Sequence, residues 1–464
     1  MYFKQFYLGC LAHASYLIAD EAAGEAAIVD PQRDIEQYLE EAKRLGVEIR
    51  HVLLTHFHAD FLAGHLELRE KTGARLYLGA KAEAEYDFQP LADGDRIDFG
   101  KVRIQALATP GHTPESTSYL VYDLEKDAVK PHAVLTGDTL FIGDVGRPDL
   151  MASIGITAEE LASMLYDSLH EKLLKLPDET LVYPAHGAGS LCGKSLSSET
   201  FSTLGQQRQM NYALQPMSRE KFIEMSTSNL PDAPAYFGYD AMLNRQERAT
   251  LGETLEKALQ PLKLDAVLRL QNSGAQVLDV RSEDDFTQGS LQGAVHVGLG
   301  GKYATWAGTV LATDRSIVIL ADPGKEQEAA MRLGRIGFDK IAGFVEGGPK
   351  ALEDRPELVR RFERIDVDAL RTRLEGPNPP RVLDVRSPGE FEGGHIEGAI
   401  NVPLNRLEKN FSEVPKGQEL AVICGSGYRS TIAVSLLANH GFESLLDIRG
   451  GMSAWGEKTA CATK

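Results

Sequence analysis

Cysteine is scarce in this chain of 464 residues, and the four that occur, at positions 10, 192, 424 and 461, form no CxxC pair. Disulfide frameworks need closely spaced, paired cysteines, so the pattern indicates individually placed thiols in a reducing compartment. The first nineteen residues also lack the basic start and the continuous apolar core of a secretory signal peptide. We therefore expect a cytoplasmic protein.

An excess of positive charge is lacking as well, because 67 acidic and 49 basic residues give a formal net charge of −18. Nucleic acids and anionic membrane surfaces attract basic proteins, so the sequence argues against both as partners. No apolar run reaches the length of a membrane span. With 43% hydrophobic and 25% charged residues, the composition is that of a globular protein, and the length predicts two to four domains.

What the first half does contain is a set of metal-binding residue types at strand ends. The apolar run 52–54 predicts a buried strand that ends at Thr55, and His56, His58 and Asp60 follow at alternate positions. On an extended backbone alternate side chains point the same way, so the two imidazoles can converge on one point. Further candidates at the ends of other predicted strands are His112, Asp138 and His186. Four such loops in one domain predict a metal site.

Residues 1 to about 245 form one predicted α/β unit, in which each of these polar clusters lies where a strand gives way to a loop. Sheet proteins commonly build active sites at such positions. A predicted strand over residues 26–29 ends in Asp30, and the pattern predicts a helix over residues 35–45 with Asp34 as its N-cap.

Four motifs of this unit together resemble those of the metallo-β-lactamase superfamily. They are Thr55-His56-x-His58-x-Asp60, Gly111-His112-Thr113, Thr136-Gly137-Asp138-Thr139 and Pro184-Ala185-His186-Gly187. The resemblance implies an αββα sandwich, and the superfamily includes hydrolases with two metal ions and dioxygenases with one iron. Two-metal members usually carry Asp-His after the second histidine, whereas here Asp60 is followed by Phe61, whose ring cannot bind a metal. This departure favours one metal, while the alternative is a packed Phe61 with a water completing a second site.

The resemblance to the mononuclear persulfide dioxygenases implies one Fe(II) per chain, bound in this domain by His56, His112 and Asp138. Two histidines and one carboxylate form the facial triad of non-haem Fe(II) oxygenases, which leaves positions open for a sulfur substrate and O₂. Zn(II) would also fit these ligands. The residues that the resemblance places around them, where they orient ligands and a bound water, are His58, Asp60 and His186.

Two further residues are candidates for substrate binding. Arg147 resembles a family arginine near the substrate and would hold a substrate carboxylate; the alternative is a surface arginine that caps a helix. Cys192 lies in a glycine-rich loop soon after His186. It is either a sulfur acceptor near the site entrance or a small buried residue.

The remainder of the chain contains an internal repeat, since residues 276–282 and 289–297 recur as residues 381–387 and 394–402. The Leu-Asp-Val-Arg strand, the Gly-His-Ile-x-Gly-Ala element and a cysteine loop after a central strand resemble rhodanese sulfurtransferase domains. This resemblance implies two small α/β domains with parallel sheets. The expected organisation is a metallo-β-lactamase-fold persulfide dioxygenase domain over residues 1–245, an inactive rhodanese-like domain over residues 255–358 and an active one over residues 359–464.

The cysteine loop decides the function of the last domain, where residues 420–423 predict a strand, Cys424 opens the loop and a helix follows. The backbone N–H groups of such a loop and the dipole of the helix stabilise an anionic persulfide. Gly425 and Gly427 allow positive φ angles, and Arg429 adds positive charge for sulfite or thiosulfate oxygens. We expect Cys424 and Arg429 to be catalytic. The loop residues expected to bind substrate are Gly425, Ser426, Gly427 and Tyr428.

The middle domain aligns residues 320–325 with that loop and has no cysteine there. It therefore cannot carry persulfide sulfur, and Pro323 also removes a backbone donor. We expect an inactive domain that spaces, docks or mediates self-association, which leaves a homo-oligomer open.

The combined pattern predicts a persulfide dioxygenase coupled to sulfur transfer. The expected substrates are O₂ and a low-molecular-weight persulfide, of glutathione or coenzyme A, and the expected product is sulfite. Sulfur transfer through Cys424 to that sulfite would give thiosulfate, and the fusion would raise the local concentration of each intermediate. Two alternatives stay open: a thioester hydrolase like glyoxalase II, which uses metal-activated water, and a persulfide carrier or sensor without turnover.

Overall fold

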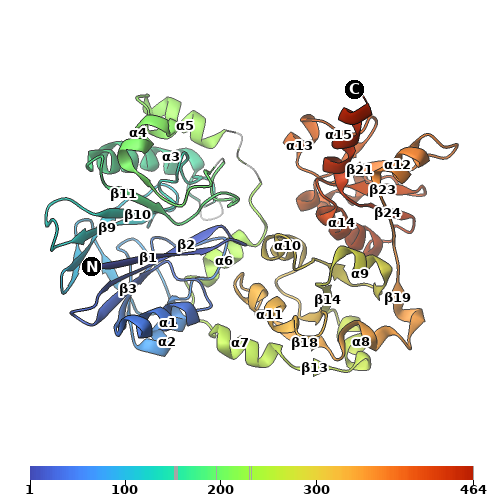
Figure 1. The fold of residues 1–464 in the computed structure, drawn as a ribbon, viewed down its shortest axis with the longest axis horizontal. Coiled ribbons are helices and arrows are strands. Elements are labelled where there is room, and N and C mark those ends of the chain that lie inside the picture. The colour runs from blue at the N-terminus through green and yellow to red at the C-terminus, as the bar shows by residue number, and fades with distance from the viewer. Residues whose placement is uncertain (151–154, 195, 229, 231, 463–464) are drawn as a thin grey trace. The chain divides into compact units, whose positions relative to one another are not determined.

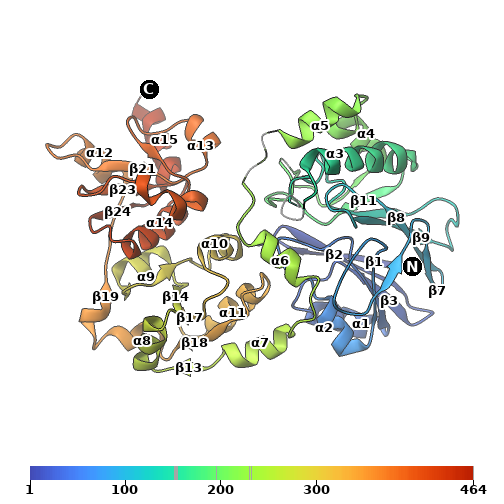
Figure 2. The same cartoon turned by 180° about the vertical axis from the view of Figure 1, so that it is seen from behind.

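The computed structural model describes residues 1–150, 155–194, 196–228, 230 and 232–462, with side chains as far as residue 456, so the side chain of Cys461 lies outside the described part. The chain forms two compact units. The first comprises residues 1–251 together with residues 334–337, and the second comprises residues 252–333 and 338–464. Figure 1 and Figure 2 show them from opposite sides.

The first unit is built on two six-stranded sheets. The first sheet has the order β1-β2-β3-β4-β5-β6 and the second has the order β12-β11-β10-β9-β8-β7. The strands of the first sheet are β1 (Tyr2–Leu8), β2 (His13–Asp20), β3 (Glu25–Val29), β4 (Glu48–Leu53), β5 (Arg75–Gly79) and β6 (Gln89–Leu91). Those of the second are β7 (Arg96–Phe99), β8 (Val102–Ala108), β9 (Thr117–Asp123), β10 (Ala133–Gly137), β11 (Leu181–Pro184) and β12 (Ser202–Thr203).

The two sheets bury one apolar core between them, to which Tyr16 and Val29 of the first sheet and Tyr119 and Leu135 of the second contribute. Helices α1 and α2 cover the outer face of the first sheet, and helices α3, α4 and α5 lie over the second (Figure 1). The helices of this unit are α1 (Glu36–Leu45), α2 (His65–Thr72), α3 (Ala158–Asp167), α4 (Leu204–Met210), α5 (Arg219–Thr227) and α6 (Phe237–Leu243). The unit is therefore the αββα sandwich that the motifs predict.

The second unit repeats one parallel α/β pattern. Its two five-stranded sheets have the equivalent orders β13-β18-β17-β14-β16 and β20-β24-β23-β21-β22, and every pairing within them is parallel. The strands are β13 (Pro261–Leu262), β14 (Gln276–Asp279), β15 (Ser290–Leu291), β16 (Val295–His296), β17 (Ile317–Leu320), β18 (Ile341–Val345), β19 (Val359–Arg360), β20 (Glu363–Ile365), β21 (Arg381–Asp384), β22 (Ile400–Asn401), β23 (Leu420–Ile423) and β24 (Leu445–Ile448). The helices are α7 (Leu251–Ala258), α8 (Leu264–Asn272), α9 (Glu283–Gln288), α10 (Tyr303–Val310), α11 (Glu326–Gly334), α12 (Val367–Leu374), α13 (Pro388–Glu392), α14 (Tyr428–Asn439) and α15 (Gly451–Ala462).

One local prediction is wrong. Helix α1 begins at Glu36, its N-cap is Ile35, and no side chain caps it. The carboxylate of Asp34 instead accepts hydrogen bonds from the side chains of Gln32 and Arg335. Across the described residues, the longest helices are neither long nor apolar enough to cross a membrane.

Candidate functional site

The loop after β4 is held by a carboxylate from the neighbouring strand. Asp30 lies just beyond β3, which pairs in parallel with β4. Its two oxygens accept hydrogen bonds from the backbone N–H and the hydroxyl of Thr55, at 2.7 and 2.8 Å. The same hydroxyl lies 3.0 Å from Nδ1 of His56, so the opposite ring nitrogen, Nε2, is directed away from this contact. Asp30 thereby orients His56 through Thr55.

His56, His112 and Asp138 converge from three separate loops. Their candidate ligand atoms all lie within 4.8 Å of one another. Oδ2 of Asp138 is 3.9 Å from Nε2 of His56 and 3.5 Å from Nε2 of His112. Nδ1 of His112 lies 2.9 Å from the carbonyl oxygen of Arg147, to which it donates, so its Nε2 carries the lone pair. Burial, together with the neighbouring imidazoles, holds the pKa of His56 well below its usual value, which keeps this ring neutral and able to bind a metal.

The carboxylate of Asp138 tests whether a cation fits this site. The residue is 2% exposed, and among the described residues neither of its oxygens has a hydrogen-bond donor. A buried carboxylate without donors is costly unless a cation balances it. Two neutral imidazoles and one such carboxylate are a suitable ligand set for a divalent transition metal. The residues therefore fit a metal ion.

A second group lies beside the first and contains His58, Asp60 and His186. Nε2 of His186 is 3.5 Å from Oδ1 of Asp60 and 3.7 Å from Oδ1 of Asp138. Nε2 of His58 is 3.1 Å from Oδ1 of Asp30, but it makes no hydrogen bond within the described structure. The ring of Phe61 is packed 4.4 Å from the ring of His58, measured between centroids. Phe61 thus packs against His58, and the three residues remain a candidate ligand set of their own.

Cys192 and Arg147 both lie against the metal-binding group. The thiol of Cys192 is close enough to Asp138 and His186 to form a third candidate ligand set, and the residue is 1% exposed. Burial raises the pKa of this thiol well above its ordinary value, and the carboxylates of Asp60 and Asp138 raise it further. The guanidinium of Arg147 donates to both carboxylate oxygens of Asp149, each at 2.6 Å. The backbone of Arg147 joins the two sides of the site, because its N–H donates to the carbonyl of Cys192 at 2.9 Å and its own carbonyl serves His112.

Sequence reasoning missed His13 as a residue that lines this region, and it missed that Asp30 anchors the loop after β4. His13 opens β2, is 1% exposed, and its ring centroid is 4.0 Å from that of Phe61 and 5.7 Å from those of His58 and His186. A single histidine in an apolar strand has no spacing that indicates a site. An isolated bridge between His13 and His186, 173 positions apart, brings it here.

The cysteine loop of the last domain joins β23 to α14. The backbone N–H of Gly427 donates to Sγ of Cys424 at 3.1 Å, and Gly427 has a φ of 97°. The carbonyl of Cys424 accepts from the N–H of Met452 at 2.7 Å. Helix α14 begins at Tyr428, so its N-terminus lies directly behind the loop.

The predicted role of Gly425 is wrong in one respect, because its φ is not among the positive values. Gly425 instead leaves room for the Arg429 side chain, because an added Cβ would lie 3.1 Å from Nη2 of Arg429. Both Nη atoms of Arg429 donate to the carboxylate of Glu390, at 2.8 and 2.6 Å. These bonds lower the pKa of Glu390 to about 2. Ser426 is exposed and Tyr428 is half-buried at the loop.

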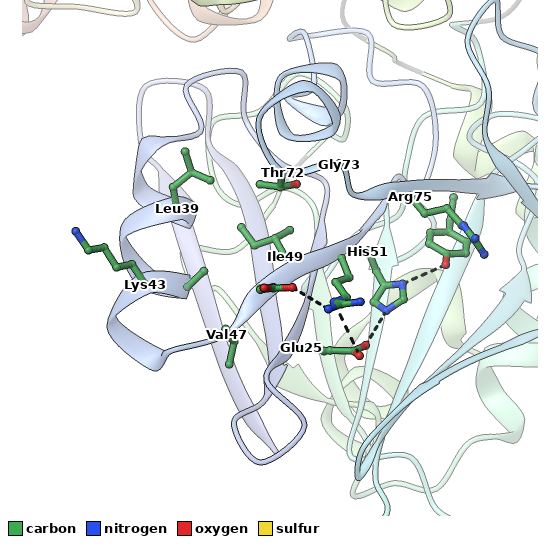
Figure 3. A pocket seen from close by; sticks show the side chains of 13 residues that line it. Glu25, Leu39, Lys43, Val47, Ile49, His51, Thr72, Gly73 and Arg75 are labelled. Carbon is green, nitrogen blue, oxygen red and sulfur yellow. Dashed lines mark hydrogen bonds and ion pairs between the residues drawn. The ribbon is translucent and has the colours of Figure 1, made fainter.

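One surface pocket of the first unit does not involve the metal-binding group. It has a volume of about 840 Å³ and lies beside β4 and β5 (Figure 3). His51 lines it, with Nδ1 3.1 Å from the hydroxyl of Tyr77 and Nε2 3.6 Å from the carboxylate of Glu25. None of the candidate metal-binding groups includes a residue of this pocket among the described residues, so the buried metal-binding group is the better candidate for chemistry.

Comparison with protein families agrees with the division of the chain into two compact units. Residues 8–186 match the metallo-beta-lactamase superfamily, and residues 263–354 and 366–458 each match the rhodanese-like domain. The chain therefore belongs to the metallo-beta-lactamase superfamily and carries two rhodanese-like domains.

Individual relatives narrow this class. The mitochondrial persulfide dioxygenase ETHE1 of Bos taurus is 33% identical over 225 residues, which cover 47% of this chain and 77% of that protein. A cytoplasmic hydroxyacylglutathione hydrolase of Arabidopsis thaliana is 35% identical over 186 residues, covering 39% of this chain and 67% of the hydrolase. A crystal structure of a metallo-beta-lactamase from Staphylococcus aureus is 32% identical with a TM-score of 0.68, covering 74% of this chain and 98% of that one. Within its superfamily the chain is a homologue of the persulfide dioxygenases, fused to two rhodanese-like domains of which the first lacks the cysteine.

Proposed function

We propose that this protein oxidises a low-molecular-weight persulfide with O₂ and passes sulfane sulfur through Cys424 to the sulfite that is formed. The observation that carries the proposal is the buried carboxylate of Asp138, without donors in the described structure, beside two histidines in a chain that also holds a built cysteine loop. In this proposal residues 1–245 are the dioxygenase domain, residues 255–358 an inactive rhodanese-like domain and residues 359–464 the sulfurtransferase domain.

The proposed metal is one Fe(II) per chain, held by His56, His112 and Asp138. A ferrous ion there would supply open positions for dioxygen and a sulfur anion. The overall reaction is RSSH + O₂ + H₂O → RSH + SO₃²⁻ + 2 H⁺. His58, Asp60 and His186 surround the ligands and hold their orientation.

Substrate binding in the first domain falls to groups on the same side of the site. Arg147 would take the carboxylate of a glutathione or coenzyme A persulfide by exchanging it for Asp149, which has the same chemistry. Cys192 lies against Asp138 and His186. In this proposal it would contact the bound sulfur substrate.

The second half of the reaction uses the cysteine loop. The Cys424 thiol takes sulfane sulfur from a second persulfide, giving Cys424-SSH and RSH. Sulfite then attacks the outer sulfur, so that thiosulfate leaves and the thiol is restored. The N–H groups of the loop, with Gly425 to Tyr428, cradle the anion, and Arg429 neutralises the incoming oxyanion.

The test uses the full-length protein loaded with Fe(II) under anaerobic conditions and then supplied with glutathione persulfide and air. We expect wild-type protein to bind about one iron and to consume O₂, with thiosulfate as product. Asp138→Asn should lower bound iron and O₂ uptake by about a hundredfold. The matched control, Cys424→Ser, should keep both iron and O₂ uptake while its product changes to sulfite. Iron-loaded protein that consumes no O₂ with any persulfide would refute the proposal.

A thioester hydrolase remains the second candidate, because the group His58, Asp60 and His186 adjoins the first and shares Asp138 through His186. It requires close to two metal ions per chain and cleavage of S-acyl-glutathione without O₂. The same metal analysis therefore decides between the two functions.

A further inference from the structure

The Cys-less rhodanese-like domain reaches the cysteine loop of its neighbour within the second unit. Helix α14, which begins just after the loop, lies against the preceding domain, beside α9 (Figure 1). The hydroxyl of Tyr428, the first residue of α14, donates to the carbonyl of Gly298 at 2.7 Å. An added Cβ on Gly301 would meet the ring of Tyr428 at 2.5 Å, so that backbone is packed directly on the ring.

The segment that holds Tyr428 is itself fixed inside the Cys-less domain. Arg332 on α11 donates to the carbonyl of Leu299 at 2.8 Å and to that of Gly301 at 3.4 Å. The N–H of Leu299 also donates to the carbonyl of Val280, just beyond β14, at 3.1 Å. Residues 298–301 therefore form a firm surface against which a neighbour can be positioned.

Ion pairs form a second link between the Cys-less domain and the cysteine loop. Asp284, at the start of α9, lies 3.5 Å from Nη1 of Arg364 and 2.6 Å from Nη2 of Arg449. Nη2 of Arg364 donates to the carbonyl of Gly427 at 3.3 Å. Gly427 is the residue whose N–H donates to Sγ of Cys424. Both links therefore end on the turn Gly427–Tyr428.

We propose that the Cys-less domain is a positioning domain, whose residues 298–301 and Asp284 hold the Gly427–Tyr428 turn so that the Gly427 N–H stays aimed at the sulfur of Cys424. The inference rests on the proposed sulfur transfer and assigns the retained inactive domain a part in it. Misplacing a catalytic group by a fraction of an ångström slows a reaction even when folding is intact. Tyr428, Gly298 and Gly301 are positioning residues in this scheme.

The chain offers a matched control on the same helix. Asn439, at the other end of α14, donates to the carbonyls of Gly293 and Ala294 at 3.2 and 3.3 Å. Like Tyr428, it joins α14 to a backbone carbonyl of the Cys-less domain, but it is eleven positions away from the loop's end. A purely structural interface predicts equal effects at both ends.

The experiment measures sulfur transfer from thiosulfate to cyanide by the full-length protein carrying Gly301→Ala, Tyr428→Phe, both together, or Asn439→Ala. We expect kcat to fall about tenfold in Gly301→Ala and about fivefold in Tyr428→Phe, with KM changed less than twofold. The double variant should resemble Gly301→Ala alone, because both changes act on one contact. Asn439→Ala should keep kcat within twofold while its melting temperature falls as much as theirs.

Alkylation of Cys424 by iodoacetamide, followed by mass spectrometry, gives a readout that needs no turnover. We expect it to slow severalfold in Gly301→Ala and Tyr428→Phe and to stay unchanged in Asn439→Ala. Equal alkylation and equal kcat in all variants would overturn the positioning role. Wild-type protein that transfers no sulfur, but whose alkylation still responds to Gly301→Ala, would refute the proposed function and leave the positioning intact.

Discussion

The two rhodanese-like halves of the second unit keep the same frame and differ at one loop. Asp279 and Arg281 in the first half form a buried ion pair at 2.6 Å, and Asp384 and Arg386 form its counterpart at 2.7 Å. In each half the arginine also donates to a backbone carbonyl eight positions on, of Gly289 or of Gly394. The frame is therefore preserved to the level of individual hydrogen bonds.

The two halves differ in the loop that follows the central strand. Strand β17 ends at Leu320 opposite Asp279, and strand β23 ends at Ile423 opposite Asp384, so Ala321 occupies the place of Cys424. Helix α11 starts five residues after Ala321, whereas α14 starts four residues after Cys424. The loop without the thiol is therefore one residue longer, and Pro323 removes one of the backbone donors that the cradle would need.

This difference shows that the frame and the chemistry of such a domain are separable. The charged pair and the parallel sheet stabilise the half that has no nucleophile as they do the half that has one. Retention of the frame without the thiol is what a domain needs if its task is to hold a neighbour.

The largest expected effect concerns the thiol itself. Cys424→Ser should abolish sulfur transfer, by about a thousandfold or more, because the hydroxyl cannot carry sulfane sulfur. Adding Ala321→Cys to this variant should not restore it, since the loop lacks the cradle that stabilises the anion. Transfer of ³⁵S from labelled thiosulfate to cyanide measures both. Recovery of a tenth of wild-type activity would show that the two loops are equivalent after all.

The next effect compares the buried ion pairs. Removing one partner of such a pair leaves an uncompensated charge, so Asp384→Ala and Asp279→Ala should each destabilise their own half by about 3 kcal/mol. Trp455 lies in the half with Cys424 and Trp306 in the other, so fluorescence in urea, with each tryptophan replaced in turn by phenylalanine, reports on each half. Exposed Glu397→Ala serves as the control, with a change below about 0.5 kcal/mol. A joint shift of both signals would mean that the halves unfold together.

A smaller effect distinguishes the halves by pH. His296 in the Cys-less half and Asn401 in the active half occupy the same position of the repeat, and each contacts a carbonyl next to the ion pair. Burial lowers the pKa of His296. His296 therefore binds a proton more readily in the unfolded chain than in the folded one. Its contribution to the free energy of unfolding is complete above about pH 6.5 and decreases as the pH falls toward the pKa of the folded state. His296→Asn should flatten this part of the profile of the Trp306 signal, and an unchanged slope would contradict it.

The smallest effect concerns the charge beside the cysteine loop. Glu390 engages both Nη atoms of Arg429, and Glu390→Gln would free positive charge for an anionic donor. We expect KM for thiosulfate to fall about threefold with kcat nearly constant, because a partly exposed ion pair contributes little. A rise in KM would show that Glu390 is needed to hold Arg429 in place.

Much of this architecture follows from local sequence pattern. The strands before His56, Asp138 and His186 are apolar runs followed closely by polar residues. The parallel pairing of β10 with β11 brings the ends before Asp138 and His186 together, and the packing of the two sheets adds the end of β4. The fold of the two rhodanese-like halves also follows from the sequence, because the same motifs with glycines at fixed positions occur in both.

What pattern could not supply came from contacts between distant segments. His13 has no partner at a recognisable spacing, and only its bridge to His186 places it near Phe61. Asp34 is a residue type that commonly caps helices, but its carboxylate accepts hydrogen bonds from Arg335, 301 positions away. The hydrogen bond from Tyr428 to Gly298 joins residues 130 positions apart, and no motif of either half predicts it.

Ala12 and Asp30 are the non-glycine residues with positive φ in the described part of the chain, at 51° and 50°. Each lies beside a histidine of the second group: the carbonyl of Ala12 is 3.3 Å from Nδ1 of His186, and Oδ1 of Asp30 is 3.1 Å from Nε2 of His58. Such a backbone costs on the order of 1 kcal/mol per residue. Glycine at position 30 would relieve this strain but would also remove the two buried hydrogen bonds to Thr55, so the strained backbone is the cost of placing a carboxylate under the histidine loop.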